Sequence, residues 1–201
     1  MFAWGKALQG QLGIGKDTDF VSSPTMIDMN TYNVKVAKVA CGANHTVLLC
    51  SEGLVYFWGQ YMHTASDLSH KVGRLYSPKL VQGFKTTRIL DVAAGSGHSL
   101  ALSQEQKVYA WGDNSNGQLG IDSRMHSSEP LLVHLPAHLK FHKISAAMAH
   151  SAAVSQQGAL FLWGSNLACQ LGYDRELKES LLPILYPKWF SHGQSENTEP
   201  N

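Results

Sequence analysis

Histidine can act as a metal ligand, a general acid or a general base, and this chain has ten histidines. Three of them, His45, His98 and His150, recur at steps of 53 and 52 residues, and each is followed by Thr or Ser. Imidazole is a frequent metal ligand, but a zinc site needs three or four ligands at one point. Equivalent positions in successive copies of a module give each ring its own surroundings instead. We therefore expect no bound metal and assign the rings a structural role, in which each bonds a nearby main-chain carbonyl at a tight bend.

A second group of histidines has helical spacing. His134, His138 and His142 are four residues apart, which would place them on one face of a helix. Pro136 lies within this segment and would break such a helix, because proline lacks an N–H and its ring clashes with the preceding turn. We interpret the spacing as coincidence.

Two serines raise the alternative of a nucleophile with its general base, since Ser99 and Ser151 directly follow His98 and His150. Adjacent residues of a strand point to opposite faces of a sheet, so these pairs are not expected to face one another. The sequence has no Gly-x-Ser-x-Gly elbow, no phosphate-binding loop ending in Gly-Lys-Ser/Thr and no His-Glu-x-x-His motif. We expect no catalytic residue and no cofactor.

The elements that position these residues are copies of one module. Trp-Gly pairs recur at steps of 54, 53 and 52 residues, beginning at Trp4, Trp58, Trp111 and Trp163. Prolines follow these tryptophans by 20, 20, 19 and 20 residues, at Pro24, Pro78, Pro130 and Pro183. The glycine markers of the module are Gly42, Gly95, Gly117 and Gly120. Markers that share one period indicate a repeat protein, whose indoles are expected to pack between copies.

Within a module the pattern predicts short strands. Val36 to Cys41, Thr46 to Cys50 and Val55 to Trp58 are rich in β-forming residues and are separated by Gly-containing turns. The proline of each module suits an outer edge strand, where a missing N–H costs little. No sustained helical period is present, although Arg175 to Leu182 is compatible with a turn or two of helix. Repeats of this size with three or four short strands are typical of β-propeller blades.

The repeat motifs point to a known family. Trp111 to Gly120 reads Trp-Gly-Asp-Asn-Ser-Asn-Gly-Gln-Leu-Gly, and Val39 to Leu49 reads Val-Ala-Cys-Gly-Ala-Asn-His-Thr-Val-Leu-Leu. With Pro130, these motifs resemble the repeat of the regulator of chromosome condensation family, over residues 2 to 186. The resemblance implies a seven-bladed β-propeller whose blades take strands from two adjacent repeats.

The chain is too short for a closed ring of that kind. Seven such units need roughly 370 residues, and the chain has 201. We therefore predict an all-β fold, a partial and open β-propeller of about three to four blades. The predicted repeat array occupies residues 1–190, with repeats at 2–50, 54–103, 107–155 and 159–186, and residues 191–201 are predicted to be a disordered polar tail.

Composition limits the classes of partner that the chain is expected to bind. A formal net charge of +1 without basic clusters argues against direct binding of nucleic acid, and no apolar run is long enough to cross a membrane. The three cysteines form no Cys-x-x-Cys pair and are interpreted as reduced thiols. These features favour a cytoplasmic or nuclear protein, or one found in both compartments.

The resemblance implies two function classes. The first is a non-catalytic scaffold or regulatory module that binds a partner protein through its blade loops, for example within a regulatory complex. The alternative is guanine-nucleotide exchange on a small GTPase, which in the family's founding member depends on a wedge inserted into one blade. The intervals from Gly5 to Gly42, from Gly59 to Gly95 and from Gly112 to Ala147 are 37, 36 and 35 residues, which leave no room for that wedge. An open ring also leaves unpaired edge strands, so self-association through blade edges is a further expectation.

Partner contacts are expected in the variable loops at 16–23, 61–76 and 122–129. The second loop is favoured because there the repeat lacks Gly-Gln-Leu-Gly and reads Gln-Tyr-Met-His after Trp58-Gly59. Its interface-favoured residues are Tyr61, Met62, Arg74 and Tyr76. The other interpretation, a loop that has drifted without gaining a function, stays open.

Overall fold

The computed structural model describes residues 1–62 and 72–186, and in these ranges it contains fourteen β-strands and two short 3-10 helices. The elements are β1 (Phe2–Lys6), β2 (Phe20–Met26), η1 (Met29–Tyr32), β3 (Val36–Cys41), β4 (His45–Cys50), β5 (Val55–Met62), β6 (Val72–Leu80), η2 (Gln82–Phe84), β7 (Ile89–Ala94), β8 (His98–Ser103), β9 (Val108–Gly112), β10 (Ser127–Leu132), β11 (Phe141–Ala147), β12 (His150–Ser155), β13 (Leu160–Ser165) and β14 (Glu179–Leu185). The predicted all-β fold is confirmed. The tail predicted at 191–201 lies outside the described residues. Neither helix is long and apolar enough to cross a membrane.

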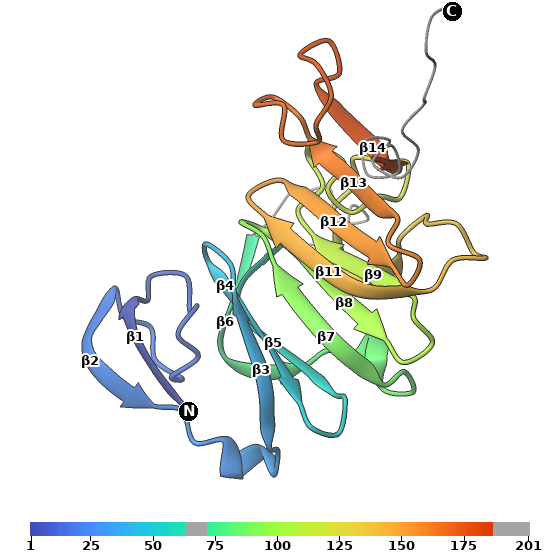
Figure 1. Cartoon of the computed structure of the whole chain (residues 1–201). Helices are drawn as coiled ribbons and strands as arrows, with labels where there is room; N and C mark the ends of the chain where they lie inside the picture. Colours follow the sequence, from blue (N-terminus) through green and yellow to red (C-terminus); the bar gives the residue numbers. More distant parts are fainter. Residues whose placement is uncertain (63–71, 187–201) are drawn as a thin grey trace, which may run out of the picture.

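Antiparallel pairing joins the strands into one two-stranded and three four-stranded sheets. The two-stranded sheet β1–β2 is followed by the four-stranded sheets β3–β6, β7–β10 and β11–β14. Figure 1 shows these sheets side by side in chain order. The Trp-Gly pair lies in the third strand of each four-stranded sheet, at β5, β9 and β13. A sheet therefore begins in one sequence repeat and ends in the next, as the resemblance implied.

The apolar core lies between the sheets rather than within one of them. Three clusters of buried side chains lie between neighbouring sheets. Trp58, Trp111 and Trp163 each belong to a different cluster. The sheets β3–β6 and β7–β10 are covered on both faces, and every residue of their strands β4 and β8 is buried. Stacking of neighbours is what buries the apolar faces that one sheet alone would expose.

The outer strands bear out one local prediction and correct another. Pro24, Pro78, Pro130 and Pro183 lie in β2, β6, β10 and β14, and each of these strands is at a sheet edge, as predicted. The helical turn expected within Arg175 to Leu182 is wrong, because Glu179–Leu185 forms β14 and pairs with β13. Pairing with an available strand edge outweighs the weak local preference of this segment.

One repeat tryptophan does not pack as expected. Trp58, Trp111 and Trp163 are 1%, 3% and 0% exposed, whereas Trp4 is 58% exposed. The expectation that all four indoles pack between copies is therefore wrong for Trp4. Trp58 and Trp163 donate to a carbonyl of the preceding unit, whereas Trp4 lies on the exposed strand β1.

Candidate functional site

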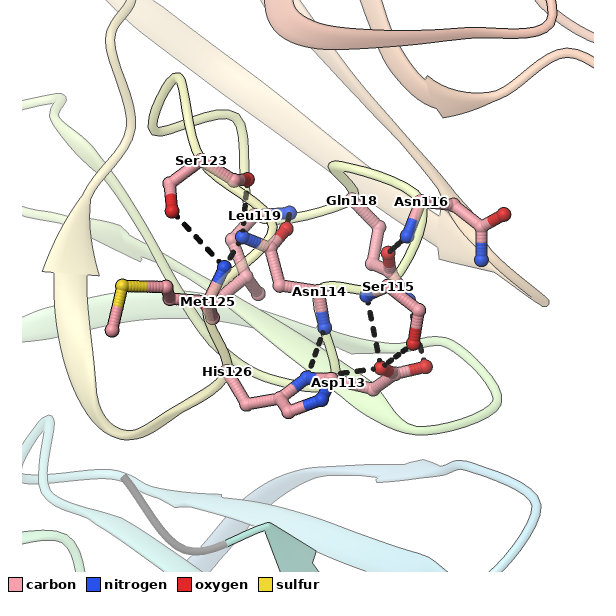
Figure 2. A network of polar contacts seen from close by, with 9 residues as sticks. All are labelled: Asp113, Asn114, Ser115, Asn116, Gln118, Leu119, Ser123, Met125 and His126. Carbon is pink, nitrogen blue, oxygen red and sulfur yellow. Dashed lines mark hydrogen bonds and ion pairs between the residues drawn. The ribbon is translucent and has the colours of Figure 1, made fainter. Parts of the chain in front are cut away.

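The glycine-rich turn between β9 and β10 is organised by a buried amide. The Asn114 side chain accepts a hydrogen bond from the N–H of Leu119 at 2.9 Å. It donates to the carbonyls of Ser123 and Met125 at 2.7 and 3.1 Å, and it is fully buried. Figure 2 shows Asn114 between the two arms of the turn. A short polar side chain thus satisfies main-chain groups that the turn leaves unpaired.

Gln118 closes the same turn from the other side. Its side-chain carbonyl accepts from the N–H of Asn116 at 2.9 Å, and its amide donates to the Asp113 carboxylate at 3.0 Å (Figure 2). The main-chain carbonyl of Gln118 accepts two hydrogen bonds from the next sheet, from Trp163 Nε1 at 2.9 Å and from Ser151 Oγ at 2.8 Å. This carbonyl is the polar link between one sheet and the next.

The first unit repeats this link. The main-chain carbonyl of Gln11, in the turn between β1 and β2, accepts from Trp58 Nε1 and from Thr46 Oγ1, both at 2.9 Å. The tryptophan and the hydroxyl residue after the histidine therefore converge on the carbonyl of the turn's glutamine. Sequence reasoning missed this, and it also missed Asn114 and its counterpart Asn166, whose shared place after Trp-Gly was the available signal.

The histidines contact serines of the following unit, not of their own. His45 Nε2 lies 3.0 Å from Ser99 Oγ, and His98 Nε2 lies 2.8 Å from Ser151 Oγ. Ser151 donates its only proton to a carbonyl, so the ring of His98 is the donor in their contact and carries its proton on Nε2. The expected main-chain carbonyl partner is wrong for His98, whose Nδ1 has no partner in the part of the chain that the structure describes.

Burial keeps these rings neutral. It lowers the pKa of His98 to about 3, helped by the neighbouring His45, and it lowers the pKa of His45 to about 4 against the opposing effect of the carbonyls of His98 and Ser96. Ser99 and Ser151 are 1% and 0% exposed. Ser151 donates its proton to the Gln118 carbonyl and not to the imidazole, so His98 does not activate it as a nucleophile. The described residues contain no cluster of three potential metal ligands either.

The glycine markers Gly42 and Gly95 leave space for the imidazole rings of His45 and His98, which pack against them. A Cβ on Gly42 would lie 2.3 Å from Cε1 of His45, and one on Gly95 would lie 2.2 Å from Cε1 of His98. Ala147 stands at this position in the third unit, where the ring of His150 is only partly buried. Burial also lowers the pKa of His150.

The junction between sheets β3–β6 and β7–β10 is built differently. Here β5 and β6 extend as a longer hairpin, in which Tyr61 pairs with Gly73 and Met62 with Val72. The predicted variable loop is therefore partly strand, and its residues 63–71 lie outside the described residues. A cavity of about 270 Å³, partly open to solvent, lies between the two sheets.

The structure divides the four predicted contact residues into two pairs. Tyr61 and Met62 line the cavity. Arg74 and Tyr76 instead face the preceding unit, because Arg74 Nε donates to Gln9 Oε1 at 2.8 Å and Tyr76 lies against Gly10. Only the first pair lies at the junction between sheets β3–β6 and β7–β10.

The chain matches the Regulator of chromosome condensation (RCC1) repeat over residues 1–49, 52–102 and 105–154, and a second form of the same repeat over 89–118. It belongs to the RCC1 repeat family. Solved RCC1-type structures resemble its fold: human WBSCR16 with a TM-score of 0.76 at 24% identity, and yeast RCC1 (Prp20) bound to Kap60 with 0.73 at 23%. The match covers 92% of this chain but 47% and 44% of those chains, so the predicted partial propeller is confirmed.

Curated RCC1-repeat relatives are larger proteins. The probable E3 ubiquitin-protein ligase HERC6 of Homo sapiens is 36% identical over 176 residues, which are 86% of this chain and 17% of that protein. The ultraviolet-B receptor UVR8 of Arabidopsis thaliana is 34% identical over 164 residues, which are 81% of this chain and 36% of the receptor. The chain thus spans well under half the length of these relatives.

Proposed function

We propose that this RCC1-repeat chain is a non-catalytic module that binds a partner protein at the junction between sheets β3–β6 and β7–β10. The observation that carries the proposal is the cavity at this junction, next to the extended β5–β6 hairpin with Tyr61 and Met62 on its wall. Aromatic and methionine side chains in a partly open recess are typical of protein interfaces.

Relatives with the same repeat support binding over catalysis. Yeast RCC1 (Prp20) has been solved in complex with Kap60, and Prp20p has been studied for its binding to Gsp1p and histones. The Ser–His contacts of this chain join adjacent sheets through side chains that are almost fully buried. A partner protein is therefore the ligand class that the chemistry favours.

A site-specific photo-crosslinker tests the proposal. p-Benzoylphenylalanine placed at Met62 should yield a discrete protein adduct in extracts of the source cells, because this side chain lines the cavity. Met125, which is 59% exposed in the β9–β10 turn, provides the matched control. An adduct at 62 that is absent at 125 supports the proposal, whereas equal labelling at both positions, or none at 62, contradicts it.

Nucleotide exchange is the competing function. Its test is the release of labelled GDP from a panel of small GTPases at substoichiometric amounts of this chain. The proposal expects release rates equal to those of the GTPases alone. Acceleration that persists at catalytic amounts would instead make the chain an exchange factor.

A further inference from the structure

The turn between β9 and β10 contains the only Asn-Gly pair of the sequence, Asn116-Gly117. In such a pair the main-chain nitrogen of the second residue can attack the side-chain amide carbon of the asparagine, which closes a five-membered cyclic imide. Glycine favours this step because it has no side chain to hinder the approach. Asparagine is accordingly among the thermolabile residues of proteins.

Two asparagines of this turn differ in how their side-chain amides are held. The Asn114 amide is fully buried and makes three hydrogen bonds to main-chain groups of the turn. Asn116 is partly exposed, and in the described part of the chain only its main-chain N–H is hydrogen-bonded. Figure 2 shows its amide pointing away from the rest of the turn. Unlike the Asn114 amide, the Asn116 amide is not held away from the nitrogen of Gly117.

The fold requires glycine at the second position of the pair. Gly117 has φ +74°, and a Cβ there would lie 2.6 Å from Cδ2 and 2.8 Å from Cα of Leu181 in the next sheet. In the first and last turns the residues equivalent to Asn116 are Gln9 and Ala168. Glutamine would need a less favourable six-membered ring, and alanine has no amide. The reactive pair is therefore confined to this one turn.

One hydrogen bond opposes the reaction in the folded chain. The N–H of Gly117 donates to the main-chain carbonyl of Asn114 at 3.1 Å. When this bond opens, the nitrogen loses its proton to solvent and attacks Cγ of Asn116. The N–Cγ bond forms as the Cγ–Nδ2 bond breaks, and ammonia leaves. Water then opens the imide at one of its two carbonyls, which gives aspartate or isoaspartate, so the sum is an amide and water converted to a carboxylate and an ammonium ion.

We propose that Asn116 is a site of spontaneous conversion to aspartate and isoaspartate, and that the isoaspartate form loosens the junction between sheets β7–β10 and β11–β14. Isoaspartate adds one carbon to the main chain between positions 116 and 117. The side chain of Gln118 holds the N–H of Asn116. The carbonyl of Gln118 accepts from Trp163 Nε1 and Ser151 Oγ. A longer main chain beside this carbonyl displaces it and weakens both bonds.

The first test follows the conversion in the whole folded chain, incubated at mildly alkaline pH. Peptide mass spectrometry measures the change from amide to acid at each asparagine, and an isoaspartate-specific methyltransferase with labelled S-adenosylmethionine measures isoaspartate. Conversion should concentrate at Asn116, and Asn116→Gln should abolish the methyl label. In urea the conversion should run about fivefold to tenfold faster, because the hydrogen bond of Gly117 no longer restrains the nitrogen.

Two outcomes of this test overturn the assigned site. The first is a folded chain that keeps Asn116 intact over a period in which the urea-unfolded chain converts it completely. The second is conversion of Asn114 in the folded chain as fast as that of Asn116, since the buried amide of Asn114 is held by its three hydrogen bonds.

The second test separates the effect of the longer main chain from that of the new charge. The isoaspartate form is purified by chromatography, and Asn116→Asp is the matched control, with the same charge on an ordinary main chain. Hydrogen exchange of the Trp163 indole N–H should be about tenfold faster in the isoaspartate form, the factor expected for loss of one hydrogen bond. Equal exchange in the two chains would overturn the effect on the junction.

Discussion

Trp163 Nε1 donates to the main-chain carbonyl of Gln118 at 2.9 Å, across 45 residues of sequence and from one sheet to the next. The indole therefore does more than fill space between blades. Because its N–H meets a main-chain acceptor held by the turn, it sets the position of the turn relative to the next sheet. The same relationship joins Trp58 to Gln11.

The first prediction compares two tryptophans that differ in this bond. Trp163→Phe should lower the free energy of unfolding by about 1–2 kcal/mol more than Trp111→Phe, because within residues 1–62 and 72–186 only Trp163 of the two donates an indole hydrogen bond. Both variants lose similar apolar area, so Trp111→Phe serves as the control. Urea denaturation followed by circular dichroism measures the difference. Equal losses would show that the bond contributes nothing to stability.

The second prediction concerns the glycine that touches the indole. Gly120 has φ +67° and its Cβ would lie 2.8 Å from Trp163 Nε1, whereas Gly158 has φ +85° with nothing within 4 Å of its Cβ. Gly158→Ala should cost about 1 kcal/mol, for the left-handed backbone alone. Gly120→Ala should cost about 1–3 kcal/mol more, from displacement of the ring. Thermal melts of the two variants test this, and a cost at Gly120 no larger than at Gly158 would contradict the packing seen here.

The third prediction addresses the buried amide. Asn114→Ala removes one acceptor and two donor contacts inside the turn and should cost about 2–4 kcal/mol. Asn116→Ala is the matched control and should stay within about 0.5 kcal/mol, because only its main-chain N–H bonds the turn. The free energies come from chemical denaturation. If the two variants are equally stable, Asn114 does not organise the turn.

The fourth prediction follows from the neutral rings. Burial lowers the folded-state pKa of His45 to about 4 and of His98 to about 3, below the ordinary value of 6.5. The unfolded chain therefore binds more protons as pH falls below 6.5, and stability is lost from there down toward pH 4 and 3. At pH 5 each ring should cost on the order of 2 kcal/mol relative to pH 7.5.

Denaturation at the two pH values measures this loss. His98→Gln, which keeps an amide donor for Ser151, should reduce the pH-dependent loss by up to about half, since His45 and His150 still carry lowered pKa values. His138 is exposed, so His138→Gln should leave the loss unchanged. A His98→Gln chain with the full wild-type loss would mean that protonation of this ring is not what destabilises the fold in acid.

The fifth prediction tests self-association at β1, which pairs only with β2 among the described strands. Phe2 and Trp4 are 60% and 58% exposed on this strand, next to an open edge. We expect mass to rise with concentration in light scattering, because an apolar open edge pairs with another chain. Trp4→Glu should reduce the effect, whereas Met148→Glu, at a residue that is 78% exposed in the turn between β11 and β12, should not. A mass independent of concentration would contradict the expectation.

Much of the fold could be predicted because it repeats. Trp58, Trp111 and Trp163, with the prolines of β6, β10 and β14, recur at one period, and each local pattern of β-formers and turns is readable within a few residues. Comparison of the repeats also showed that the Gly-Gln-Leu-Gly motif is missing after Gly59. The strand at Tyr61 and Met62 was not predicted, because strand extension there depends on pairing with β6 rather than on local composition.

The sequence by itself determined the module, its number of copies and the β character of the chain, since these follow from which residue types recur and how far apart. Only the tertiary structure decided that His98 contacts Ser151, that the main-chain carbonyl of Gln118 accepts from Trp163, and that Trp111 lines a cavity. These contacts join residues from adjacent modules. Their geometry comes from how whole sheets stack, and a period along the chain carries no information about which atoms then meet.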